Sequence, residues 1–132
     1  MTARTVLLTV AVIAIGGSAR ADVVKAGTWH AVAHAGTSGG WQIVVDNGAA
    51  YVEMTKDFAT EKAPDLKIFL SPRKSSELDG DNATKGSLRV AKLTSHRGAA
   101  RYALPRGVDL AKYKSIVLQC EQYAVLFAKS AL

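Results

Sequence analysis

The chain has 132 residues, 48% of them hydrophobic, and carries 17 basic against 11 acidic residues, a formal net charge of +6. This length suits one domain. The excess of basic residues is mild and they are spread along the chain, so the charge pattern is not that of a nucleic-acid-binding protein. With one cysteine, an intramolecular disulfide is excluded, so the domain must be stable through its hydrophobic core.

Residues 1–21 have the form of an export signal. Arg4 supplies a positive start, residues 6–15 are apolar apart from Thr9, and Ala19-Arg20-Ala21 has the small residues that a signal peptidase recognises. A spanning helix needs about 20 apolar residues, so we expect no stable membrane span after cleavage. The sequence therefore predicts a signal peptide over 1–21 and a single exported domain over 22–132, in the periplasm or outside the cell.

The rest of the chain has the two-residue hydrophobic period of strands, interrupted by turn residues. The strongest local prediction is a hairpin of residues 41–45 and 49–54 around Asn47-Gly48, a sequence typical of tight turns. Further strands are expected at 28–34, 66–70, 88–93, 100–104, 116–120 and 123–127, with a surface loop at 71–85 and one helical turn at 109–113. This pattern predicts an all-β, antiparallel sandwich or barrel-like fold of about seven to nine short strands.

The strand at 66–70 is expected to be half-buried. Its apolar residues Leu66, Ile68 and Leu70 share one face, and Lys67 and Phe69 share the other. No phosphate-binding glycine loop or nucleophile elbow occurs in the chain, so hydrolase chemistry has no candidate residues.

Cys120 is the first candidate functional residue. An unpaired cysteine in an exported protein is a reactive thiol, a ligand, half of an intermolecular disulfide, or a buried filler, and the residues around it leave all four open. On a strand, Cys120 shares its face with Ile116 and Leu118, so we expect it to be at least half buried. The polar Glu121 that follows predicts a bulge or bend just after the cysteine.

His34 is the second candidate, because a histidine at a strand end could pair with Cys120 across a sheet. It opens a glycine-rich loop, Gly36 to Gly40, that can bring backbone close to a bound group. His30 and His34 cannot chelate one ion together on a strand, where four residues span about 13 Å. No metal site is predicted.

The order of several short motifs resembles a known family, the electron-transfer DM-thirteen domain, which accompanies DOMON domains. The resemblance extends over the whole expected mature domain, and its most specific parts are the Pro-Asp-Leu strand and the late cysteine. The motifs are Gly27-x-Trp29, His34-x-Gly36-x-Ser38-Gly39, Phe58, Pro64-Asp65-Leu66-x-Ile68-Phe69-Leu70-Ser71, Gly98-x-x-x-Tyr102-x-Leu104-Pro105, Tyr113-x-Ser115-Ile116-Val117, Cys120 and Phe127-x-x-x-x-Leu132.

This resemblance favours a redox or electron-transfer module over a stand-alone enzyme, and it implies that Cys120 is a bare thiol or a ligand to a prosthetic group such as haem. His34 is then the candidate second ligand. The partner would be a redox protein or a component of the cell envelope. The alternative is a noncatalytic binding β-sandwich in which Cys120 fills the core.

Overall fold

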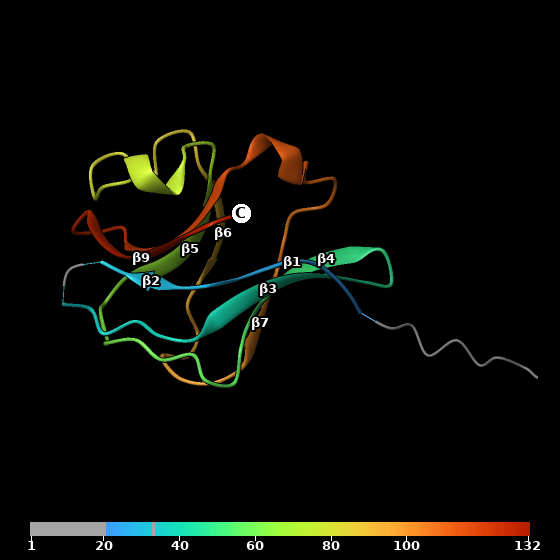
Figure 1. Cartoon of the computed structure of the whole chain (residues 1–132), viewed down its shortest axis with the longest axis horizontal. Helices are drawn as coiled ribbons and strands as arrows, with labels where there is room; N and C mark the ends of the chain where they lie inside the picture. Colours follow the sequence, from blue (N-terminus) through green and yellow to red (C-terminus); the bar gives the residue numbers. More distant parts are fainter. Residues whose placement is uncertain (1–20, 33) are drawn as a thin grey trace, which may run out of the picture.

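The computed structural model describes residues 21–32 and 34–132, and all statements about the structure refer to these residues. The predicted export signal over 1–21 lies outside them, except for Ala21. The described chain forms two antiparallel sheets that pack as two layers, as Figure 1 shows. None of its described helices is both long and apolar enough to cross a membrane.

The first layer is a four-stranded sheet in the order β1-β3-β4-β7. Its strands are β1 (Asp22–Thr28), β3 (Gly40–Asp46), β4 (Ala49–Met54) and β7 (Ala100–Ala103). The β3–β4 hairpin is the one predicted from the sequence. Its turn residues Asn47 and Gly48 have φ angles of 53° and 78°, the left-handed backbone that this short turn requires.

The second layer is a five-stranded sheet in the order β2-β9-β8-β5-β6. Its strands are β2 (His30–Ala31), β9 (Val125–Ala131), β8 (Ser115–Cys120), β5 (Leu66–Ser71) and β6 (Leu88–Lys92). Two single turns of 3-10 helix complete the fold, η1 (Ser75–Glu77) and η2 (Leu110–Lys112). The predicted all-β sandwich is confirmed.

The sequence prediction of one strand over 28–34 is wrong, because the chain changes sheets at Trp29. β1 ends at Thr28 in one sheet, β2 begins at His30 in the other, and the Trp29 side chain is buried between them. Its backbone N–H donates to the Gly39 carbonyl at 3.0 Å. On the opposite side of the sandwich, residues 93–99 carry the chain from β6 to β7 in the same way.

Two groups of buried side chains hold the layers in place. The main core lies between the sheets, where residues such as Trp41, Ile43 and Val52 of the first sheet pack with Ile68 and Leu118 of the second. Roughly 1.5–3 kcal/mol is gained for each such side chain removed from water, so this core supplies the main stabilisation.

A second, smaller core covers the other face of the five-stranded sheet. Phe69 and Val117 on this face pack with Leu78 and Ala83 from the loop between β5 and β6. Phe69 is 2% exposed, so the prediction that its face of the strand is exposed is wrong for this residue. The loop is polar in sequence but supplies these two apolar residues as a cover, and it lies above the sheet in Figure 1.

The loops at one end of the sandwich pack closely at Gly39. It has a φ angle of 85°, and an added Cβ would lie 2.6 Å from both the backbone N and the Cα of Phe58. Gly48 has a similar φ of 78° but open space around it. We expect Gly48→Ala to cost about 1 kcal/mol from left-handed backbone strain, and Gly39→Ala about 3 kcal/mol because the Phe58 segment must also move.

Chemical denaturation of both variants measures these costs. Equal losses in the two proteins would show that the close contact between Gly39 and Phe58 does not exist.

Candidate functional site

Cys120 is the last residue of β8 and faces the main core. It is 2% exposed and belongs to the same buried cluster as Ile116 and Leu118, which confirms the expected burial and the shared face. Across the sheet it lies opposite Leu66 of β5 on one side and Val125 of β9 on the other. The thiol is therefore buried at the end of a strand, with the chain reaching the surface directly after it.

The next four residues, Glu121 to Ala124, form the turn between β8 and β9. The Ala124 N–H donates to the Glu121 carbonyl at 3.2 Å, and Ala124 has a φ of 53°, which is uncommon for a residue with a side chain. The expected bend after Cys120 is present. The bulge lies earlier, where the β8–β9 register shifts between Leu118 and Gln119.

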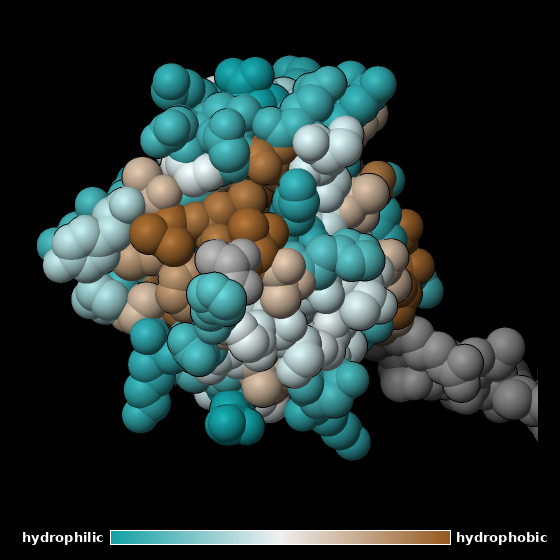
Figure 2. Space-filling model, turned by 60° about the vertical axis from the view of Figure 1, so that its left-hand side comes forward, coloured by the Kyte–Doolittle hydropathy of each residue, from teal (hydrophilic) through white to brown (hydrophobic). Residues whose placement is uncertain are grey.

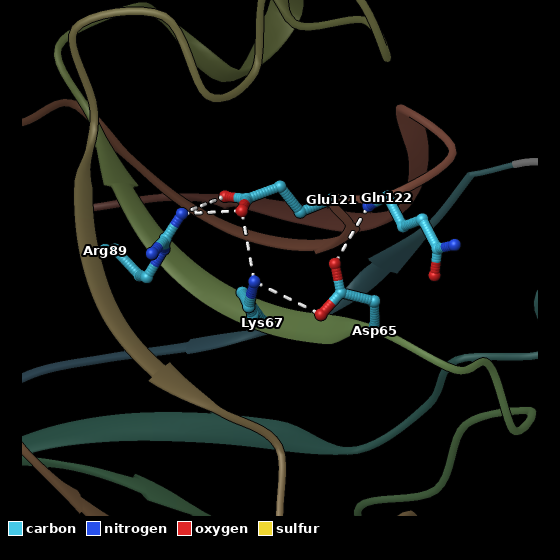
Figure 3. Close-up of polar contacts among 5 residues, drawn as sticks. All are labelled: Asp65, Lys67, Arg89, Glu121 and Gln122. Carbon is cyan, nitrogen blue, oxygen red and sulfur yellow. Dashed lines mark hydrogen bonds and ion pairs between the residues drawn. The ribbon is translucent and has the colours of Figure 1, made fainter.

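A group of charged side chains joins this turn to neighbouring strands. The Lys67 Nζ on β5 lies 3.1 Å from the Asp65 Oδ1 and 3.0 Å from the Glu121 Oε1. The Arg89 Nη2 on β6 donates to the Glu121 Oε2 at 2.8 Å. Figure 3 shows Glu121 pointing toward Arg89 and Lys67, with Asp65 on the far side of the lysine. We call these four residues, Asp65, Lys67, Arg89 and Glu121, the turn clamp.

Backbone hydrogen bonds reinforce the clamp. The Glu121 N–H donates to the Asp65 carbonyl oxygen at 3.1 Å, and the Gln122 N–H donates to the Asp65 Oδ2 at 2.9 Å. Asp65 thus accepts from two consecutive residues of the turn while its other oxygen binds Lys67 (Figure 3). The turn is attached to the start of β5 mainly through polar contacts.

The opposite charges shift the titration of the clamp carboxyl groups. The hydrogen bond from Arg89, followed by that from Lys67, lowers the pKa of Glu121 below its ordinary value. The hydrogen bond from Lys67 lowers the pKa of Asp65 as well. Contact first with Glu121 and then with Asp65 raises the pKa of Lys67. All three groups are therefore charged in the native protein at neutral pH.

The β5–β6 loop holds the same turn from the other face of the sheet. The Gln119 Nε2 donates to the Gly80 carbonyl at 2.9 Å, and Gln119 is 1% exposed. A Cβ at Gly80 would lie 2.1 Å from the Ala124 carbonyl oxygen, so the loop approaches the turn at a distance that glycine alone allows. The buried Gln119 side chain thus links β8 to the β5–β6 loop through its amide group.

His34 does not join Cys120 in one site. It is exposed, in the turn that follows β2, whereas Cys120 is in the core. β9 lies between β2 and β8, which places these two strands roughly 10 Å apart. Over residues 21–32 and 34–132, no hydrogen bond joins the two side chains, and no group of three His, Cys, Asp or Glu residues could hold a metal ion.

The surroundings of Cys120 do not fit the haem that the resemblance implies. Sites for small molecules and cofactors are clefts of about 300–1,000 Å³ that bury most of the ligand. Clefts of about 660, 560 and 490 Å³ open on the described surface, and the first is lined by residues such as Gly36, Thr60 and His96. None of the three is lined by Cys120, whose sulfur is enclosed by the core.

The surface next to the β8–β9 turn is partly apolar. Tyr123 in the turn is 62% exposed, and Val125, the cross-strand neighbour of Cys120, is 39% exposed. Figure 2 shows this side of the molecule, where apolar surface is surrounded by hydrophilic residues. Apolar surface with a polar border is typical of places where another protein binds.

The comparison with protein families identifies the family of the chain. The family model for electron transfer DM13 matches residues 30–132, which include eight of the nine strands, β2 to β9. The chain therefore belongs to the electron transfer DM13 family, and it is a redox-related module of that family. No curated protein matches it. No solved structure matches it either.

The turn clamp was not predicted from the sequence. The sequence predicts a bend at Glu121, a strand position for Lys67 and a motif position for Asp65, but not the contacts among them. The contacts of Glu121 with Asp65 and Lys67 depend on the strand register in which Leu66 lies opposite Cys120. This register cannot be predicted from the sequence. The available signal is weak. Asp65 precedes β5, Lys67 lies at its start and Glu121 follows β8, but Lys67 and Glu121 are 54 positions apart in the sequence.

We predict that the clamp makes stability fall in acid. The pKa of Glu121 is lowered from 4.5 in the native protein, so the unfolded chain binds a proton more readily. The contribution of this carboxylate is complete above about pH 4.5 and is lost as the pH falls through the lowered native pKa. In urea unfolding measured between pH 3 and 7, Glu121→Gln should lose less stability in acid than the wild type.

Glu77→Gln is the matched control, since Glu77 is exposed and makes no ion pair with the described residues. If the wild type and Glu121→Gln lost stability in parallel below pH 4.5, the clamp would not stabilise the fold.

Proposed function

We propose that this chain works as an exported electron-transfer module in which the Cys120 thiol is the reacting group, uncovered when the β8–β9 turn opens. The observation that carries this proposal is the position of Cys120. It is the last residue of β8, and it is followed by a turn in which Gln122, Tyr123 and Ala124 are all exposed. Family membership supports the redox role.

The polar attachment of the turn makes local opening of the turn the route to the sulfur. Segments that open locally have few buried apolar contacts and solvent-exposed hydrogen bonds. The turn is attached through the clamp and through backbone bonds to Asp65, whereas the strands on either side are part of the core. Opening the turn would expose Cys120 while the rest of the sandwich stays folded.

The chemistry proposed is thiol–disulfide exchange with a disulfide of a redox protein partner. Cys120 loses its proton to solvent, and its sulfur attacks one sulfur of the partner disulfide. A new S–S bond forms between the two proteins, the partner's S–S bond breaks, and the second partner sulfur leaves as a thiolate. In this exchange the Cys120 sulfur goes from the thiolate to the disulfide oxidation level and the leaving partner sulfur goes from the disulfide to the thiolate level, so the two changes balance within the mixed disulfide. The apolar surface at Tyr123 and Val125 supports binding of the partner beside the turn.

A second function is supported by the burial of the thiol. Because Cys120 is 2% exposed and lies in an aliphatic core, it could serve as a small apolar filler in a noncatalytic domain that binds a cell-envelope component. In that case the sulfur reacts only when the whole domain unfolds. The two functions are distinguished by the reactivity of the native thiol.

We expect the native protein to react with a small aromatic disulfide whose released thiolate absorbs visible light. The reaction should release one thiolate per chain, faster than the domain unfolds, because opening of the turn is sufficient. Glu121→Gln should speed the reaction several-fold, since it removes the clamp contacts to Arg89 and Lys67. Cys120→Ser should abolish it.

Glu53→Gln is the control for this experiment. Glu53 is also an ion-paired carboxylate, bound to Arg101 at 2.7 Å, but it lies on the four-stranded sheet away from the turn. Its replacement should leave the thiol rate unchanged. A thiol rate equal to the global unfolding rate, with no response to Glu121→Gln, would favour the binding domain with a structural cysteine.

A further inference from the structure

β1 presents an unprotected edge of the four-stranded sheet. It spans seven residues, Asp22–Thr28, and among the described residues it pairs with β3 alone. Val23 and Val24 are 55% and 49% exposed at this edge. An exposed edge strand with apolar side chains offers unpaired N–H and C=O groups to another strand, and most proteins cover or charge such an edge.

The sequence at the start of β1 is complementary to itself in the antiparallel direction. When Asp22-Val23-Val24-Lys25 is placed beside a second copy of itself, Asp22 lies opposite Lys25 of the second copy, and Val23 lies opposite Val24 of the second copy. A shift by one residue in either direction places each charged residue opposite an uncharged one. The favourable register is therefore unique within this segment.

The orientation of the side chains agrees with this pairing. Asp22 lies opposite Val45 and Lys25 opposite Ile43, two residues apart on β3, so Asp22 and Lys25 are on the same face of the sheet. Val23 lies opposite Val44 on the other face. The register shift between Val23 and Lys25 makes Val24 the extra residue of a bulge, which allows two consecutive valines to be on one side.

We propose that β1 pairs antiparallel with β1 of a second copy of this chain and joins the two four-stranded sheets into one continuous sheet. A twofold axis between Val23 and Val24 relates the copies, so each Asp–Lys pair forms twice and the assembly closes at two chains. Cross-strand pairs of opposite charge and of β-branched residues are the contacts that stabilise neighbouring strands. This proposal is independent of the role of Cys120.

The contact is short compared with stable interfaces, which bury about 1,200–2,000 Å². We therefore expect a reversible dimer with a dissociation constant in the micromolar range. Sedimentation equilibrium of the purified chain, with its first residue established by mass spectrometry, measures this constant. A thiol reductant should not change it, because no disulfide is involved.

Charge exchange tests the register. Asp22→Lys and Lys25→Asp should each weaken the dimer about tenfold or more, because both ion pairs of the dimer become like-charged pairs. The double variant Asp22→Lys/Lys25→Asp should dimerise like the wild type, and so should an equimolar mixture of the two single variants. Lys56→Asp, an exposed charge change outside β1, is the control.

Circular dichroism confirms that each variant is folded before it is compared. The proposal is overturned if the wild-type chain stays monomeric up to about 1 mM. A dimer with a free energy of association of only about 4 kcal/mol would be detected at that concentration. A dimer that tolerates both single variants, or that is not restored in the double variant, overturns it as well.

Discussion

The antiparallel pairing of β5 with β8, in which Leu66 lies opposite Cys120, is the contact on which the candidate site depends. This register brings Asp65, the residue before β5, to the turn that follows β8. Asp65 can then accept hydrogen bonds from Glu121 and Gln122 and bind Lys67 with its remaining oxygen. A register shift of one residue would turn Cys120 to the opposite face of the sheet and separate these groups.

The architecture combines a rigid sandwich with one end that is held by polar contacts. The chain passes from one sheet to the other on both sides of the sandwich, at Trp29 and between β6 and β7. The two buried clusters cover both faces of the five-stranded sheet, so β8 is fixed along its length. The β8–β9 turn instead depends on ion pairs, and surface ion pairs are weak compared with core packing. The end of β8 is therefore the part of the strand where a buried thiol could become accessible without loss of the fold.

Much of the fold could be predicted from the sequence, because alternation of apolar residues and the Asn47-Gly48 turn are local signals. The face on which Cys120 lies followed from the same alternation with Ile116 and Leu118. The change of sheet at Trp29 could not be predicted, because it depends on which strands pair. The burial of Phe69 was missed because a polar loop that carries Leu78 and Ala83 covers it. The contacts of Glu121 with Lys67 and Arg89 depend on the register of β5, β6 and β8, and the charged residues near the strand ends give only a weak signal of them in the sequence. His34 was considered a partner of Cys120, but the insertion of β9 between β2 and β8 keeps them apart.

The central claim is that Cys120 is reached by local opening of the β8–β9 turn and not by unfolding of the domain. It is tested most directly by the dependence of Cys120 alkylation on urea concentration, well below the unfolding transition. Local opening exposes little surface, so the account predicts a rate that changes only slightly with urea, while global unfolding followed by circular dichroism depends on it steeply. An alkylation rate with the same steep dependence as global unfolding would contradict the account.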